Sequence, residues 1–176
     1  MKASQSGFSM IEVLITIAIL VVGLLGLAGL QSRVAQAELE AFQRAQALVM
    51  MQDMADRISA NKKLADNYIM NDIGIPAVDM DCTGMTSYKL DLCDFNNMLI
   101  GAAEKKVAAG PNIGGMIGGR ACITSPEPFV YNITIAWQGL GATIEPADPC
   151  GKGEYGDDKQ RRTVSLQVRV AQLSAL

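Results

Sequence analysis

The pattern of hydrophobic residues changes abruptly at Phe8. The seven residues before it are polar, with one positive charge at Lys2, whereas the 18 residues from Val13 to Leu30 include a single polar residue, Thr16. At about 1.5 Å per residue, an α-helix over that stretch is about 27 Å long, close to the roughly 30 Å hydrocarbon core of a membrane. We therefore expect residues 8–30 to span a membrane as one helix.

The helix is expected to continue well beyond the apolar stretch. There is no proline before Pro76 and no glycine between Gly29 and Gly74, so helix is predicted from about residue 8 to about residue 63. Residues 31–63 are expected to be amphipathic and to pack under a folded head. A coiled-coil stalk is the weaker alternative, because Arg44 and Gln52 interrupt the heptad pattern. The predicted apolar face combines Leu30, Val34, Ala37, Ala41, Leu48 and Ala55, and it is widened by Ala47, Met51, Met54 and Ile58.

Residues 64–176 are predicted to form a globular head of the α+β class. Residues 64–93 are rich in turn-forming residues and are expected to be loop. A short second helix is expected at about 95–108, capped by Asp94, with Phe95, Leu99, Ala102 and Val107 on its core side and Gly110-Pro111 closing it. Strands are expected over residues 119–124, 130–138 and 163–173. The last two alternate between apolar and polar residues, which predicts an antiparallel sheet with one buried face, packed on the long helix. The 139–162 stretch between them is expected to be a long loop.

Composition excludes several classes of function. The net charge is −3, which gives no electrostatic footprint for nucleic acid. The chain has no histidine, which removes Ser-His-Asp and Cys-His catalysis and histidine-ligated zinc. Asp157-Asp158 could suggest calcium, but the spacing of a calcium loop is absent. We therefore expect neither an enzyme nor a cofactor or metal.

The four cysteines, Cys82, Cys93, Cys122 and Cys150, all follow the apolar stretch and include no C-x-x-C pair. An even number of separated cysteines is typical of disulfides formed in an oxidising compartment. Three pairings are possible, and buried free thiols are the alternative. Cys82–Cys93 and Cys122–Cys150 are favoured because each pair closes one local loop. Lys2 on one side and the cysteines on the other predict that the N-terminus lies in the cytoplasm.

Glu12 is the residue that a simple membrane anchor does not explain. A carboxylate at the centre of a membrane helix costs on the order of 2.5–3.5 kcal/mol, and less near the end of the helix. If the chain were cut after Gly7, the new amine at Phe8 would lie four residues before Glu12. The amine of one subunit and the carboxylate of its neighbour would then neutralise each other and set the register of stacked helices.

The string Gly7-Phe8-Ser9-Met10-Ile11-Glu12, followed directly by the apolar stretch, resembles the prepilin signal of type IV pilins and type II secretion pseudopilins. This resemblance implies that residues 1–7 are a leader peptide and that prepilin peptidase cuts after Gly7. It also implies that Phe8 becomes N-methylated and that Glu12 directs assembly. The protein would then be a single-pass protein of the bacterial inner membrane with a periplasmic head, and would later reach the pilus and cell surface.

Within this family the chain is most similar to minor pilins of the PilV type, the type IV pilus modification proteins. The similarity lies in VGLLGLAGLQ (22–31), MADRISANK (54–62), the Cys93-Asp94 start expected for the second helix, the 131–137 strand and RRTVSLQVRV (161–170). It implies a subunit that helps to initiate or tip the pilus and supports adhesion. Its implied partners are other minor pilins, the major pilin, prepilin peptidase and the inner-membrane assembly platform. The alternatives are a minor pseudopilin of a type II secretion system and a surface- or DNA-binding tip module, the latter requiring an exposed basic patch around Arg161, Arg162 and Arg169.

Overall fold

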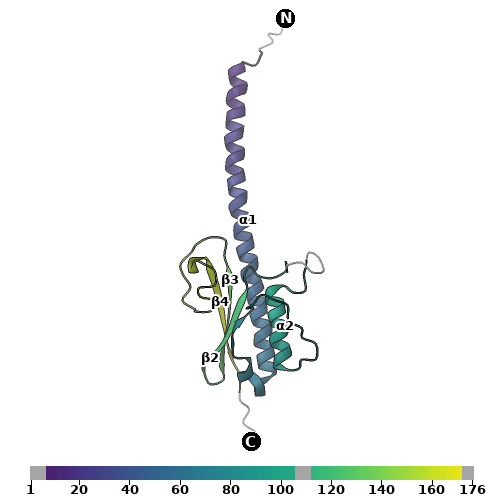
Figure 1. Cartoon of the computed structure of the whole chain (residues 1–176). Helices are drawn as coiled ribbons and strands as arrows, with labels where there is room; N and C mark the ends of the chain where they lie inside the picture. The colour runs from purple at the N-terminus through teal and green to yellow at the C-terminus, as the bar shows by residue number, and fades with distance from the viewer. Residues whose placement is uncertain (1–6, 106–111, 172–176) are drawn as a thin grey trace. The chain divides into compact units, whose positions relative to one another are not determined.

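The computed structural model describes residues 7–105 and 112–171 and has an α+β fold (Figure 1). The chain divides into two compact units, residues 1–39 and residues 40–176, and we call the second the head unit. In chain order the elements are α1 (Met10–Ala60), the 3₁₀ helix η1 (Lys62–Tyr68), β1 (Met70–Ile73), α2 (Tyr88–Ile100), β2 (Arg120–Glu127), β3 (Val130–Gln138), the 3₁₀ helix η2 (Asp158–Gln160) and β4 (Arg161–Arg169).

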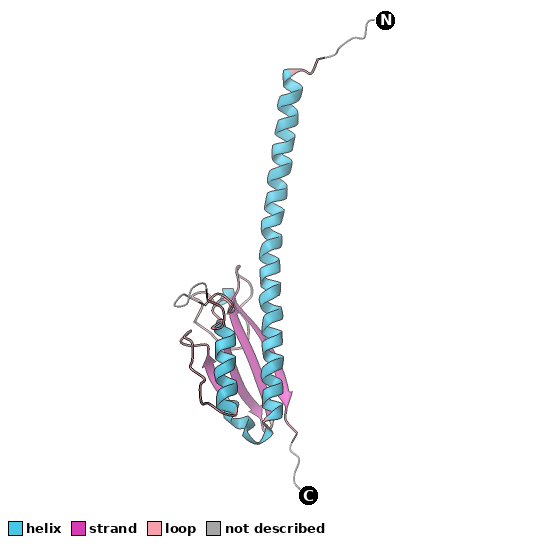
Figure 2. Ribbon diagram, turned by 90° about the vertical axis from the view of Figure 1, so that its right-hand side faces the viewer, coloured by secondary structure: helices cyan, strands magenta, loops and turns pink. Residues whose placement is uncertain are grey.

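The four strands form one antiparallel sheet in the order β1-β2-β3-β4. β3 and β4 pair without interruption from Val130–Arg169 to Gln138–Arg161, whereas the register shifts within each of the other two pairings. The last part of α1 and α2 lie side by side against one face of this sheet (Figures 1 and 2). The expected fold class, a long N-terminal helix packed on a small antiparallel sheet, is confirmed.

The buried face of α1 in the head unit is made by Ala47, Met51, Met54 and Ile58, each at most 1% exposed. These residues were expected only to widen the face. Of the residues expected at its centre within the head unit, Ala55 is buried (4% exposed), but Ala41 and Leu48 are exposed, so the predicted centre is wrong there. At about 100° per residue, the methionine-containing stripe is rotated by about a quarter turn from the line that runs through Leu30 and Leu48. The helix packs its larger, flexible methionine side chains, which fill the space under the sheet.

The predicted position of the second helix is also wrong. α2 covers Tyr88–Ile100 and not 95–108, so Asp94 lies inside it and Ser87 precedes it. The helix stops at Gly101, whose left-handed conformation (φ 70°) lets its N–H reach back to the carbonyls of Asn97 and Met98. Phe95 and Leu99 are fully buried as expected, but Ala102 is only half-buried and beyond the helix. Val107 and Gly110-Pro111 lie outside the described residues.

The prediction that residues 64–93 are all loop is wrong, because they contain most of η1, the whole of β1 and the start of α2. β3 has the predicted bounds, β2 extends to Glu127, and β4 begins at Arg161 and ends at Arg169. The alternation in β3 suggested one buried face, yet Thr134 and Ala136 on the other face are buried too. The 139–160 segment folds over that face, and it places Cys150 and Tyr155 against Cys122 and Ala136.

Candidate functional site at the start of the long helix

The first turn of α1 begins directly after the predicted processing point. Gly7 and Phe8 lie in irregular backbone before the helix, and the Phe8 side chain is 84% exposed. The Ser9 carbonyl accepts hydrogen bonds from the N–H groups of Glu12 (3.0 Å) and Val13 (3.4 Å), which starts the helical ladder. The bond between Gly7 and Phe8 therefore lies outside the hydrogen-bonded helix.

Glu12 is exposed and lies in the first turn of α1. The N–H groups at the start of a helix carry a partial positive charge, so an acid is tolerated better there than in the middle of the apolar stretch. This local stabilisation is available to any helix and does not by itself explain an acid in an apolar segment.

The apolar part of α1 has its side chains on the outside. One window of this helix is long and apolar enough to cross a membrane, and none of that window is buried. Thr16, the polar residue in it, donates its hydroxyl to the Val13 carbonyl at 2.8 Å. This bond satisfies the hydroxyl within the helix, so Thr16 does not have to interrupt the apolar surface.

Two family models match consecutive segments of this chain. Residues 2–28 match the prokaryotic N-terminal methylation motif, and residues 29–98 match type IV pilin Tt1218. Over residues 2–98 the chain is that of a type IV pilin with a prepilin methylation motif. Type IV pilins are structural subunits rather than enzymes, which agrees with the expectation drawn from composition. No curated protein and no solved structure matches this pilin.

The pilin contains the two disulfides Cys82–Cys93 and Cys122–Cys150. The first joins the segment before α2 to the buried face of α2, because Cys93 lies inside that helix. The second joins β2 to the 139–160 segment and holds that segment on the outer face of the sheet. Both bridges are in the head unit, and disulfides of this kind are typical of proteins that fold in an oxidising compartment.

The three arginines that could have formed a basic patch have separate roles. Arg161 is fully buried, whereas Arg162 is directed to Glu40 of α1, with Nη2 3.3 Å from Oε1. Only the third, Arg169, has a largely exposed side chain (78%). Neighbouring residues on a strand point to opposite faces of the sheet, which separates Arg161 from Arg162. These three residues therefore do not make the exposed cationic surface that a DNA-binding tip would need.

Both carboxylates of the acidic pair Asp157-Asp158 have partners within the 139–160 segment or at the start of β4. Asp157 accepts a hydrogen bond from the Lys159 N–H (3.0 Å) and caps η2. Asp158 accepts from the Gly153 N–H (2.9 Å) and lies 3.3 Å from Arg161 Nε. These contacts explain the pair as loop structure, and the calcium hypothesis is not needed to account for it.

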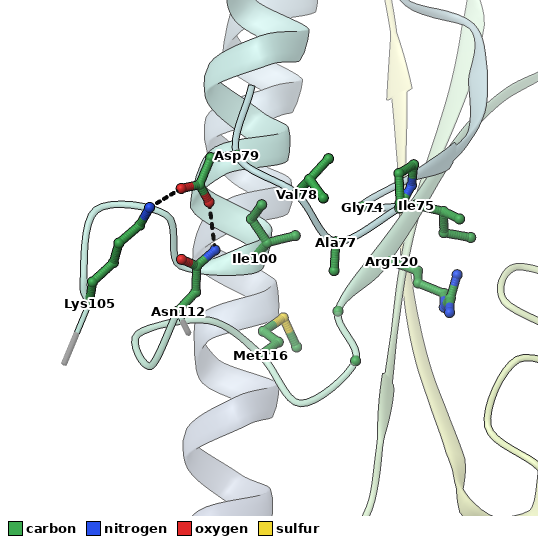
Figure 3. A pocket seen from close by; sticks show the side chains of 13 residues that line it. Gly74, Ile75, Ala77, Val78, Asp79, Ile100, Lys105, Asn112, Met116 and Arg120 are labelled. Atoms are coloured by element: carbon green, nitrogen blue, oxygen red, sulfur yellow. Dashed lines mark hydrogen bonds and ion pairs between the residues drawn. The ribbon is translucent and has the colours of Figure 1, made fainter. Parts of the chain in front are cut away.

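The head unit of the pilin has a cavity of about 540 Å³ beside the segment that joins β1 to α2 (Figure 3). At one end of it the carboxylate of Asp79 is ion-paired with Lys105 and accepts a hydrogen bond from Asn112 (2.8 Å). The hydrogen bond from Lys105, followed by that from Asn112, holds the pKa of Asp79 below its usual range. The sequence analysis did not single out this cluster, because its members are far apart along the chain.

Asp79 connects two residues, Lys105 and Asn112, that are separated along the chain. Lys105 and Asn112 are themselves paired as an isolated β-bridge, so the carboxylate joins the two ends of one loop. Arg120 lines the opposite end of the cavity (Figure 3), and its Nη2 is ion-paired with Glu154 at 3.1 Å. Each of the charged side chains that line the cavity, Asp79, Lys105 and Arg120, thus has an ion-pair partner in the head unit.

Proposed function

We propose that this protein is a minor type IV pilin of the PilV type. It enters the bacterial inner membrane through residues 8–30, with its N-terminus in the cytoplasm and its head in the periplasm. Prepilin peptidase removes residues 1–7 and methylates the amine of Phe8. The mature subunit then joins other minor pilins and the major pilin on the inner-membrane assembly platform. There it helps to initiate or tip the pilus, and it supports adhesion once the pilus reaches the cell surface.

The observation that carries this proposal is the position of Glu12. It is a carboxylate in the first turn of a helix whose next 18 residues have no charge, and it lies four residues after the residue that processing would make the N-terminus. The new amine of one subunit and the carboxylate of another form a neutral pair. Because an unpaired charge in an apolar environment is far more costly than a paired one, the pairing selects one axial register between neighbouring helices.

Glu12→Gln tests this proposal, with Glu38→Gln as the matched control on the same helix. We expect both variants to insert into the membrane and to carry N-methylated Phe8, as measured by mass spectrometry of the mature N-terminus. We expect Glu12→Gln, but not Glu38→Gln, to lose co-purification with the other pilins of a piliated strain. Unchanged co-purification of Glu12→Gln would show that the carboxylate has no assembly role, and an intact Met1 would overturn the processing step.

A deletion strain separates the pilus role from the type II secretion role. A minor pilin predicts fewer surface pili with normal secretion of exoproteins. A minor pseudopilin predicts a normal number of surface pili with reduced secretion of exoproteins. The match of residues 29–98 to a type IV pilin model supports a role in the pilus over a role in secretion.

A further inference from the structure

β4 has an unpaired edge. It is the last strand in the order β1-β2-β3-β4 and hydrogen-bonds to β3 on one side (Figure 2). It is nine residues long, and its pairing with β3 has no register shift. A straight edge of this length presents a row of backbone donors and acceptors that another strand can use.

The register identifies which backbone groups are on that edge. The Gly139 N–H bonds to the Gln160 carbonyl, and the Val170 N–H bonds to the Phe129 carbonyl, one bond at each end of the β3–β4 pair. In an antiparallel ladder the bonded residues alternate, so residues 162, 164, 166 and 168 bond to β3. The N–H and C=O groups of Thr163, Ser165, Gln167 and Arg169 therefore point away from β3. Within residues 7–105 and 112–171, the backbone N–H groups of these four residues make no hydrogen bond.

The opposite edge of the sheet is blunted, whereas this one is not. β1 has four residues, a register shift in its pairing with β2, and Asp72 in a left-handed conformation (φ 66°). Short length and irregular backbone are the usual ways of protecting an edge from further pairing. β4 has the sequence RRTVSLQVR, with neither proline nor glycine to interrupt it.

The apolar face of the sheet is also incomplete beside β4. Val164, Leu166 and Val168 point toward the core with Ile133 and Ile135, and they pack against it. The two isoleucines are fully buried, but the three β4 side chains are only partly buried. An additional strand would cover them, so side-chain burial and backbone hydrogen bonding favour the same occupant.

We propose that the free edge of β4 accepts an extended strand from another subunit of the pilus. This inference rests on the proposed function and adds the mode of contact. The incoming strand has alternating side chains, with apolar residues over Val164, Leu166 and Val168 and polar residues beside Ser165 and Gln167. It carries an acid near the exposed Arg169. A second copy of β4 fits poorly, because β4 has three arginines and no acid, so antiparallel pairing would bring arginines of both copies together.

Gln167→Pro removes one outward N–H and adds a ring at the edge without breaking a bond to β3. Gln167 makes no side-chain hydrogen bond within the described parts of the chain, so Gln167→Ala is a matched control that changes the side chain and keeps the N–H. Each variant is made as the full chain, with the photo-crosslinking residue p-benzoylphenylalanine in place of Thr163, in a piliated strain lacking the native copy. Thermal melting checks the fold, and we expect Leu166→Pro, which loses a bond to β3, to be the destabilised member of the set.

We expect crosslinks from the Gln167→Ala chain to another pilus subunit, and at least about a tenfold lower yield from Gln167→Pro, which corresponds to about 1.4 kcal/mol. Equal crosslinking yields from two folded variants would overturn the edge proposal. The proposed function would still stand if the leader is removed and co-purification depends on Glu12. Crosslinking mainly to a second copy of this chain would overturn the proposed occupant. Failure of the Gln167→Ala chain to co-purify with any pilus subunit would overturn the pilus function as well as this inference.

Discussion

At the scale of single residues, Arg161 holds the outer layer of the head. Its guanidinium donates to the carbonyls of Cys150 and Pro146, each at 3.0 Å, and to that of Asp148. Its Nε lies 3.3 Å from Asp158 Oδ1, an ion-pair distance without hydrogen-bond geometry. One planar cation, with donors on two nitrogens at fixed positions, thus satisfies three carbonyls of the segment that carries the Cys122–Cys150 bridge.

We expect Arg161→Ala to lower the free energy of unfolding by about 3 kcal/mol or more, because it leaves a cavity and several buried carbonyls without a donor. Arg161→Lys should recover only part of this loss. Arg169→Ala is the control on the same strand, and its exposed side chain predicts a change within about 0.5 kcal/mol. Urea unfolding of the full chain in detergent gives the three values. Equal stabilities of Arg161→Ala and Arg169→Ala would show that the buried contacts contribute little.

The same residues show what a sequence can predict at this scale. Gly7, Phe8 and Glu12 form a local motif, so their spacing alone leads to the hypothesis of processing and assembly. Arg161, Arg162 and Arg169 look equivalent in the sequence. Their partners, among them Pro146 and Glu40, lie 15 and 122 residues away, and only the folded chain brings them together.

At the scale of elements, Gly101 determines where α2 ends. It has φ 70°, and a Cβ added there would lie 2.0 Å from the Gly115 backbone nitrogen. We expect Gly101→Ala to destabilise the head by more than about 2 kcal/mol, from backbone strain and the clash together. Gly84→Ala separates the two causes, since Gly84 has φ 77° with open space around it and should cost about 1 kcal/mol. Similar losses of stability for the two variants, measured by thermal melting, would contradict the close approach.

The elements that were predicted well are those with strong local signals. α1 follows from a long stretch without helix breakers, and β3 follows from its alternation of apolar and polar residues. α2 was misplaced because Asp94 was interpreted as a cap and Gly101 as an interior residue. The burial of Thr134 and Ala136 could not be predicted, because it depends on a distant segment that Cys150 holds in place.

At the scale of the whole molecule, three tyrosines link different parts of the head unit. Tyr68 of η1 donates its hydroxyl to Asp91 of α2. Tyr131 of β3 donates to Asp66 of η1 at 2.5 Å, and Tyr155 of the 139–160 segment donates to the Gly118 carbonyl before β2 at 2.9 Å. Burial is the main reason why the pKa of each is raised to about 12, and the neighbouring carboxylates of Asp91 and Asp66 add to the shift for the first two.

Because the pKa of each of these tyrosines is raised in the folded head, the stability of the head falls at alkaline pH. The folded head keeps these three protons up to about pH 12, whereas the unfolded chain releases them near pH 10. The contribution of the three hydroxyls is therefore fully present below about pH 10 and is lost as the pH rises through about 12. We expect the free energy of unfolding to fall over this interval, and phenolate absorbance to rise together with the loss of the near-ultraviolet circular dichroism of Trp137.

Tyr131→Phe is the variant that tests this coupling, because it keeps the aromatic ring in the core and removes one of the three hydroxyls. The bond to Asp66 is lost at neutral pH, so the variant should start from a lower stability. Its stability should then fall less steeply between about pH 10 and about pH 12, because two raised groups remain instead of three. An unchanged slope would show that Tyr131 does not contribute to the alkaline transition. Ionisation of these tyrosines near pH 10 with the dichroism intact would show that the hydroxyls do not join the parts of the head.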